Sequence, residues 1–199
     1  RSDSKYKFNY FMDIQKAIEI LNIGGIIIYP TDTAFGMGCR IDKHEAVDRF
    51  FRIRKRPRDK PTPILVASID MALTYFDAPS EIVRRLMDEH WPGALTIVAP
   101  AKKELLYSPI RGDTDTVGIR MPDHETTLAI VEGVGVPIIG SSANFHGAPT
   151  PYRAADLDPA LVALVDGVVP GECKAGNVST VIDCTTDPIT IIRQGAVAL

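Results

Sequence analysis

The stretch Ile26-Ile27-Ile28-Tyr29-Pro30-Thr31-Asp32-Thr33-Ala34-Phe35-Gly36-Met37-Gly38 decides the fold. Its first four residues form a short apolar run rich in β-branched side chains, which predicts a buried strand. Pro30 ends that strand, and a loop of hydroxyl groups and glycines follows. Ligands tend to bind where loops leave strand ends in open α/β sheets. From its spacing alone, a tight turn without a ligand is the simpler interpretation of this loop.

The spacing of apolar residues predicts further elements on both sides of this stretch. Helices are expected at 14–21 (capped by Asp13), 44–53, 81–89, 124–132 and 159–165, and strands at 64–67, 95–99, 117–121, 136–140, 168–169, 180–184 and 189–193. Strands and helices mix without strict alternation. We therefore expect the α/β class, with one open, twisted, mixed β-sheet flanked by helices. Residues 1–12 are expected to form an N-terminal extension, and 13–199 a single domain.

Composition and charge narrow the class of protein. The 199 residues are 45% hydrophobic and carry a net charge of −3, which argues against a general polyanion binder. The three cysteines are an odd number without C-x-x-C spacing, so neither a disulfide framework nor a structural zinc site is expected. No apolar signal or membrane-spanning stretch stands out, and we expect a cytoplasmic protein without membrane contact.

A basic segment follows the second predicted helix. Six basic residues and one acid lie within the nine positions 52–60. Arginine forks and lysine point charges suit triphosphate oxygens, although cations at a solvated helix end are the common alternative. Pro57 and Pro61 favour the first interpretation, because they would hold the charges in a fixed extended segment.

Polar groups also follow or interrupt three later strands. Small polar residues occupy 140–147 after a strand, and hydroxyl groups open the strand at 179–183. Arg120 and Arg193 stand alone in apolar runs and need a partner if they are buried. We expect Arg193 to reach an anion or a carboxylate such as that of Asp183. Walker A, G-x-G-x-x-G, H-E-x-x-H and G-x-S-x-G patterns are missing, and the four histidines lack metal-ligand spacing, so no metal site is predicted.

Seven motifs in order resemble those of the YrdC-like threonylcarbamoyl-AMP synthase family, over about residues 13–195. They are Tyr29–Gly38, Arg54–Pro61, Trp91-Pro92-Gly93, Arg120-Met121-Pro122, Ser142-Ala143-Asn144, Ser179–Asp183 and Arg193-Gln194-Gly195. Each motif is weak alone, and their order and spacing carry the resemblance. The chain departs from the family pattern at Arg54, where Lys is usual, and at Phe35, where Tyr is frequent.

The resemblance implies a YrdC-like catalytic domain and a nucleotidyltransferase. Its substrates would be ATP, L-threonine and bicarbonate, and its products threonylcarbamoyl-AMP and pyrophosphate. Mg²⁺ is implied with ATP, and a tRNA-modifying threonylcarbamoyl transferase complex would act downstream, with a possible weak contact to tRNA. The implied catalytic residues are Arg54, Arg56 and Lys60. The implied ATP contacts are Arg56, Lys60, Thr116, Asn144, Tyr152 and Arg193, and the implied threonine contacts are Thr33, Arg120, Ser142 and Ser179.

Two alternatives remain at this point. One is an RNA-binding module that uses the basic segment, which the net charge and the lack of an aromatic stacking motif disfavour. The other is a nucleotide-binding paralogue without synthase activity, which the retained Ser142-Ala143-Asn144 and Ser179-Thr180 segments disfavour.

Overall fold

The computed structural model of this chain describes residues 12–199, and the predicted strand after Ile26 is β1 (Ile27–Tyr29). All three residues of β1 are buried. β1 pairs antiparallel with β2 (Gly36–Gly38) and parallel with β8 (Gly167–Val168), while β7 (Ser141–Ser142) adds to the outside of β2. The hydroxyl-rich loop therefore connects two adjacent strands of a four-stranded sheet.

A six-stranded sheet contains the remaining strands, in the order β10-β9-β4-β5-β3-β6. Their bounds are β3 (Ile64–Leu65), β4 (Leu95–Pro100), β5 (Thr116–Arg120), β6 (Ile138–Ile139), β9 (Thr180–Asp183) and β10 (Thr190–Arg193). β4 pairs antiparallel with β5 and parallel with β9, so the sheet is mixed. Each of these strands lies within or next to a range predicted from apolar spacing.

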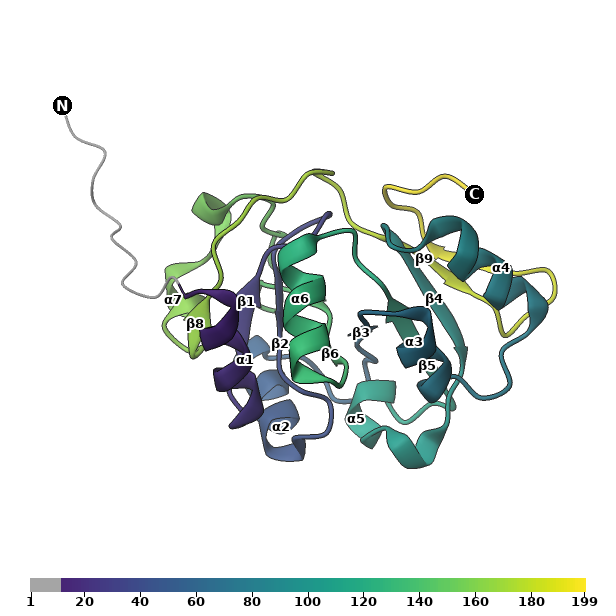
Figure 1. Cartoon of the computed structure of the whole chain (residues 1–199), viewed down its shortest axis with the longest axis horizontal. Coiled ribbons are helices and arrows are strands. Elements are labelled where there is room, and N and C mark those ends of the chain that lie inside the picture. The colour runs from purple at the N-terminus through teal and green to yellow at the C-terminus, as the bar shows by residue number, and fades with distance from the viewer. Residues whose placement is uncertain (1–11) are drawn as a thin grey trace.

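Helices flank both sheets. They are α1 (Ile14–Asn22), α2 (His44–Arg54), α3 (Ile69–Tyr75), α4 (Glu81–His90), α5 (Ser108–Arg111), α6 (Glu125–Val134) and α7 (Pro159–Val162), with 3-10 turns at Lys103–Leu105 and Ala154–Asp156. The Asp13 carboxylate accepts a hydrogen bond from Lys16 N at 2.8 Å, which caps α1 as predicted. α1 and α6 lie side by side over the four-stranded sheet, and α3 and α4 lie over the six-stranded sheet (Figure 1).

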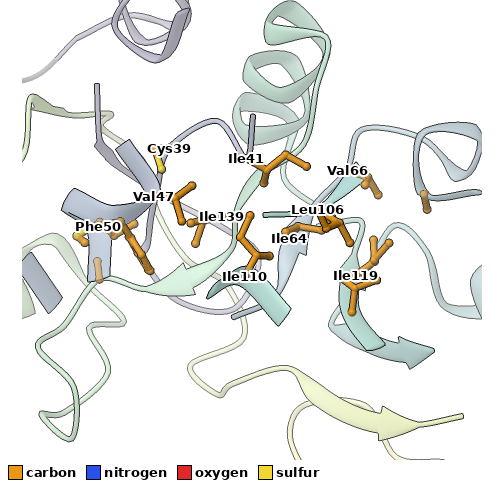
Figure 2. Close-up of a cluster of buried hydrophobic side chains, with 14 of the residues drawn as sticks. Cys39, Ile41, Val47, Phe50, Ile64, Val66, Leu106, Ile110, Ile119 and Ile139 are labelled. Carbon is orange, nitrogen blue, oxygen red and sulfur yellow. The ribbon is translucent and has the colours of Figure 1, made fainter. Parts of the chain in front are cut away.

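The larger hydrophobic core joins the sheets to α2 and α5. In Figure 2, Val47 and Phe50 of α2 lie toward Ile139 of β6, and Ile110 of α5 lies between Ile139 and the end of β5. On β4, β5 and β9 every second residue enters this core, as Leu95, Ile97, Val117, Ile119 and Ile182 do. The residues between them point to the opposite face of the sheet, because side chains alternate along a strand.

The predicted architecture is confirmed in class and differs in one detail. The structure is α/β, with open mixed sheets flanked by helices, but hydrogen bonding divides the strands into two sheets instead of one. The division falls at Gly140, which separates β6 of the larger sheet from β7 of the smaller one. The sheets are joined there by an isolated bridge of Arg40 with Ile138, by a bond from Ile139 N to Cys39 O at 2.9 Å, and by the Tyr29 hydroxyl, which donates to Ile139 O at 2.5 Å.

The described part of the chain begins at Met12 and contains three cysteines. Of the predicted extension at 1–12, all but Met12 lies outside the described residues; Met12 is buried, and its N donates to Val168 O at 3.1 Å. Cys39, Cys173 and Cys184 are free thiols. Between residues 12 and 199, no helix has the length and apolar character needed to cross a membrane.

Candidate active site

A cavity of about 490 Å³ lies on the face of the six-stranded sheet that the core does not use. Its floor is formed by residues two apart on neighbouring strands: Thr96 and Val98 of β4, Thr116, Gly118 and Arg120 of β5, and Val181 and Asp183 of β9. The β1–β2 loop and β7 form the facing wall, the C-terminal end of α2 adds Arg54, and the segment that follows α2 adds Arg56. The strand-end segments and the basic segment singled out in the sequence therefore meet around one cavity.

The charge of the cavity is strongly positive. Its lining includes four arginines, Arg54, Arg56, Arg120 and Arg193, and a single acidic residue, Asp183. Among the ion pairs formed within residues 12–199, only Arg120 of these four has a carboxylate partner. Because a charge that leaves water without a counter-ion is costly, three of these arginines favour an anion in the cavity.

Arg120 is held at one end of the cavity by the β1–β2 loop. Its guanidinium forms an ion pair with Asp32, donates to Thr33 Oγ1 at 2.8 Å and donates from Nε to Gly93 O at 3.0 Å. Burial lowers the pKa of Arg120, while Asp32 acts in the opposite direction. Thr33 in turn shares a 3.0 Å hydrogen bond with Thr31. The side chain is thus fixed in place before any ligand binds.

Arg54 is the most buried cation of the basic segment, with 3% of its surface exposed. It donates to Asn144 O at 2.7 Å, to Asn144 Oδ1 at 3.2 Å and to Ser141 Oγ at 2.5 Å. Burial, with a contribution from nearby Arg56, lowers the pKa of Arg54 to about 10. Its three neutral acceptors hold the guanidinium without cancelling its charge.

The rest of the basic segment divides between the cavity and the surface. Arg56 is partly buried, donates to Lys60 O at 3.2 Å and to Pro61 O at 2.5 Å, and its pKa is lowered by burial. Arg58 is exposed and pairs with Asp48 at 2.7 Å. Lys60 is exposed and does not line the cavity. These nine positions therefore contain both cations that line the cavity and cations exposed to solvent.

Arg193 does not contact Asp183, contrary to one of the partners expected from the sequence. Its Nε and one terminal nitrogen donate to Ser179 O at 3.1 and 2.9 Å, and the same nitrogen lies 3.0 Å from Ser179 Oγ. Asp183 instead accepts from the backbone and hydroxyl of Thr185 at 2.8 and 2.6 Å. The antiparallel pairing of β10 with β9 sets Thr190 opposite Asp183 and Arg193 opposite Val181, toward the start of β9, so Ser179 is the nearer acceptor.

Ser179 contacts both β4 and β10 in the cavity wall, through Thr96 and Arg193. It is buried, and its hydroxyl lies 3.0 Å from Thr96 Oγ1 of β4. Arg193 is exposed as a whole, yet burial of its guanidinium end lowers its pKa, and nearby Tyr152 acts in the opposite direction. The edge strand β10 therefore contributes its cation through contacts with the end of β9.

Eight of the eleven candidate residues line the cavity. These are Thr33, Arg54, Arg56, Thr116, Arg120, Ser142, Ser179 and Arg193. The other three, Lys60, Asn144 and Tyr152, lie outside the lining. The polar atoms of Asn144 already form hydrogen bonds within the protein. Its amide nitrogen donates to Phe145 O at 3.0 Å and to Ala148 O at 2.6 Å, and its main-chain and side-chain oxygens accept from Arg54.

Several residues that build the site have no role among those predicted from the sequence. Asp32 is the counter-ion of Arg120, Ser141 accepts from Arg54, and Thr96 contacts Ser179. Asp32 could have been singled out as the one acid between two threonines after a buried strand. Thr96 carries no such signal, because one threonine in an apolar strand is ordinary.

These features define a class of protein: a single α/β domain whose mixed sheet carries a cavity lined by four arginines and one acidic residue. The family model Sua5/YciO/YrdC, described as "Telomere recombination", matches residues 19–195. The chain therefore belongs to the Sua5/YciO/YrdC family.

Individual relatives agree with this family. A protein of Bacillus subtilis named Threonylcarbamoyl-AMP synthase is 34% identical over 188 residues, covering 92% of this chain and 54% of its own length. One of the same name from Xanthomonas euvesicatoria is 33% identical over 168 residues, covering 82% of this chain and 88% of its own length. The crystal structure of Pyrococcus abyssi Sua5 complexed with L-threonine superposes with a TM-score of 0.86 at 33% identity, covering 92% of this chain and 54% of that one. The chain thus spans about half the length of the Bacillus and Pyrococcus relatives.

Proposed function

We propose that this protein is an L-threonylcarbamoyladenylate synthase, a nucleotidyltransferase that acts on L-threonine, bicarbonate or CO₂, and ATP. The observation that carries the proposal is the cavity, where three arginines (Arg54, Arg56 and Arg193) have no carboxylate partner among residues 12–199 and Arg120 pairs with Asp32, in a chain of net charge −3. Such a cavity suits substrates that bring several negative charges together. The names of the relatives and the L-threonine complex of the Pyrococcus protein support the same reaction.

The proposed chemistry requires positioning and charge stabilisation. The amine of L-threonine forms a bond to the carbon of CO₂ and loses a proton, which gives a carbamate. A carbamate oxygen then forms a bond to the α-phosphorus of ATP. The bond from that phosphorus to the β-bridging oxygen breaks, and pyrophosphate leaves with the electron pair. Two anions must approach each other, so fixed cations lower the barrier, and no protein nucleophile is needed.

The threonine end of the site is proposed around Arg120. Its guanidinium would face the carboxylate of the amino acid, and Thr33, Ser142 and Ser179 would supply hydroxyl groups beside it. Asp32 keeps Arg120 oriented through their ion pair. Since Arg120 is already held by three protein acceptors, little ordering of this side chain would accompany binding.

The nucleotide end is proposed around the uncompensated cations. Arg56 and Arg193 would contact the phosphates directly, and Thr116 would contact ATP from β5. Arg54 is proposed as a catalytic cation. It donates hydrogen bonds to Asn144 and Ser141 and would supply positive charge to the site. Lys60 and Tyr152 would join the ATP contacts from positions outside the cavity lining.

We also propose that Mg²⁺ enters the site bound to ATP. When bound, the ion would neutralise charge on the triphosphate as pyrophosphate departs. Within residues 12–199 there is no group of three or more His, Cys, Asp or Glu that could hold a metal ion. Phosphate oxygens and water would therefore be its main ligands, and Asp183 is the carboxylate in the lining that could add one.

The proposed product would be used by a tRNA-modifying threonylcarbamoyl transferase complex in the cytoplasm, where ATP and tRNA are found. The exposed Lys55 and Lys60 offer a place for weak contact with tRNA.

Pyrophosphate release in a mixture of the protein, ATP, Mg²⁺, L-threonine and bicarbonate tests the reaction. We expect release only when both L-threonine and bicarbonate are present, together with threonylcarbamoyl-AMP detected by mass spectrometry. Equal release without L-threonine would mean a plain ATPase. Binding of RNA or ATP without release would instead favour the RNA-binding or nucleotide-binding alternative.

A further inference from the structure

Two hydroxyl groups meet in the cavity, one on β4 and one directly before β9. Thr96 Oγ1 lies 3.0 Å from Ser179 Oγ, and both residues are buried and line the cavity. Thr96 interrupts the otherwise apolar stretch 95–99. A valine would suit this strand as well as a threonine does, so β4 itself does not need the hydroxyl.

The Thr96–Ser179 pair keeps one O–H donor that the protein does not use. Each hydroxyl has one hydrogen to donate and two lone pairs that can accept. Ser179 Oγ accepts from Arg193 Nη2 at 3.0 Å, because arginine can only donate. One hydrogen lies between Thr96 and Ser179, whichever of them donates it. Neither hydroxyl forms any other hydrogen bond within residues 12–199, so the second hydrogen has no acceptor there.

A second hydroxyl pair in the same cavity has no such surplus. Thr31 and Thr33 of the β1–β2 loop also lie 3.0 Å apart, between their hydroxyl oxygens. Thr31 donates its hydrogen to Ala34 O at 2.6 Å, so the hydrogen between the two hydroxyls is that of Thr33. Thr33 also accepts from Arg120 at 2.8 Å. The protein therefore uses both hydrogens of this pair, whereas the Thr96–Ser179 pair has one left for a ligand.

We infer that Thr96 is a positioning residue, which donates to Ser179 and so turns the Ser179 hydrogen toward the carboxylate of bound L-threonine. This inference rests on the proposed function, in which Ser179 contacts the amino acid. Thr96 is the deeper member of the pair, with 3% of its surface exposed against 7% for Ser179. Ser179 is therefore the hydroxyl that meets the ligand, and Thr96 acts through it.

The charges around the pair favour a negatively charged acceptor. Arg193 donates to Ser179, and its positive charge makes the Ser179 hydroxyl a stronger donor. Burial lowers the pKa of Arg120, and the charge of Arg193 adds to this effect, so the two guanidinium groups lie near each other. A carboxylate facing Arg120 is thus within the region that the Ser179 hydrogen serves, and hydrogen bonds to charged groups are stronger than neutral ones.

Thr96→Val removes the hydroxyl and keeps the shape of the side chain. We expect it to weaken L-threonine binding about 3–10-fold, the usual contribution of one hydrogen bond, and to leave ATP binding unchanged. The KM for L-threonine should rise by a similar factor, with a smaller change in kcat. The melting temperature should stay within about 5 °C of the wild type, because one hydrogen bond is a small part of the total stability.

The test is a double-mutant cycle of the wild type, Thr96→Val, Ser179→Ala and the double variant. Calorimetric titration measures the affinities for L-threonine and ATP, and pyrophosphate release measures the kinetics. Because Thr96 acts through Ser179, Thr96→Val should have little further effect once Ser179 is replaced by alanine. Thr96→Ser is the matched control. It keeps the hydroxyl and should restore most of the affinity, which a general disturbance of β4 would not allow.

Three results would overturn the inference: unchanged threonine affinity in Thr96→Val, an equal loss with and without Ser179, or no recovery in Thr96→Ser. The second result would make Thr96 a direct ligand contact. A wild type that neither binds L-threonine nor releases pyrophosphate would refute the proposed function and the inference with it. A wild type that binds L-threonine without releasing pyrophosphate would refute the proposed function, and the cycle of affinities would still decide the role of Thr96.

Discussion

At the residue scale, two neighbouring arginines of the basic segment differ in what they contact. Arg56 lines the cavity and bonds only to main-chain carbonyls, whereas Arg58 points to solvent and pairs with Asp48. Both residues are positively charged and they lie two positions apart in the sequence, so only the tertiary structure distinguishes their surroundings.

This difference predicts unequal effects of alanine substitution. Arg56→Ala should lower the rate of pyrophosphate release about 10²–10³-fold, or ~2.7–4 kcal/mol, by analogy with loss of one oxyanion donor. Arg58→Ala, the matched control, should leave the rate unchanged, because an exposed ion pair contributes about 0–1 kcal/mol to stability. Steady-state kinetics of both variants checks this. An unchanged rate in Arg56→Ala would show that the triphosphate lies elsewhere.

Arg120 combines a role in stability with the proposed role in threonine binding. Arg120→Ala should weaken L-threonine binding by about 2–5 kcal/mol and change ATP binding much less. It also leaves Asp32 buried without its partner, which should cost about 3–5 kcal/mol of the free energy of unfolding.

Calorimetry and urea unfolding separate the two effects. The double variant Arg120→Met with Asp32→Asn should recover stability but not threonine affinity, because it removes both buried charges. Intact threonine affinity in Arg120→Ala would make Arg120 a structural ion-pair residue only.

At the element scale, Gly140 decides how the two sheets join. It lies between β6 and β7, and the Leu65 side chain of β3 fills the space where its Cβ would stand. The turn brings Ser141 within reach of Arg54 and places Ser142 in the cavity lining.

Gly140→Ala should therefore lower the free energy of unfolding by about 1–3 kcal/mol, the usual cost of overpacking. Adding Leu65→Val should recover part of that loss by shortening the clashing side chain. Chemical denaturation of the single and double variants measures both effects. Equal stabilities of the two variants would mean that Leu65 is not the source of the strain.

At the scale of the whole molecule, the chain is acidic overall but positive in its cavity. Such a distribution should make the fold sensitive to small multivalent anions. Pyrophosphate at 100 times its Kd should add about 2.7 kcal/mol of stability, or about 5–10 °C in Tm. Sodium chloride of equal ionic strength is the control, and Arg56→Ala with Arg193→Ala should lose most of the shift. The same shift in that double variant would place the anion outside the cavity.

The elements were largely predictable, because amphipathic spacing and capping residues are local signals. Asp13 caps α1, and the apolar runs at β1, β4 and β9 became buried strands. The short strands β2 (Gly-Met-Gly) and β7 (Ser-Ser), by contrast, are made mostly of residues without strand propensity, and their pairing with each other and of β2 with β1 defines them as strands. The helices α3 and α5 were also missed.

The sequence by itself determined the α/β class, the buried strand before the threonine loop, and the set of cations and hydroxyl groups available for chemistry. Only the tertiary structure decided which of these groups meet. It paired Arg120 with Asp32, turned Arg193 to Ser179 instead of Asp183, and left Arg54 buried among neutral acceptors. The physical reason is that helix and strand periodicity are encoded by neighbouring residues, whereas the partners of a buried cation lie far away in the sequence, 90 positions for Arg54 and Asn144 and 88 for Arg120 and Asp32.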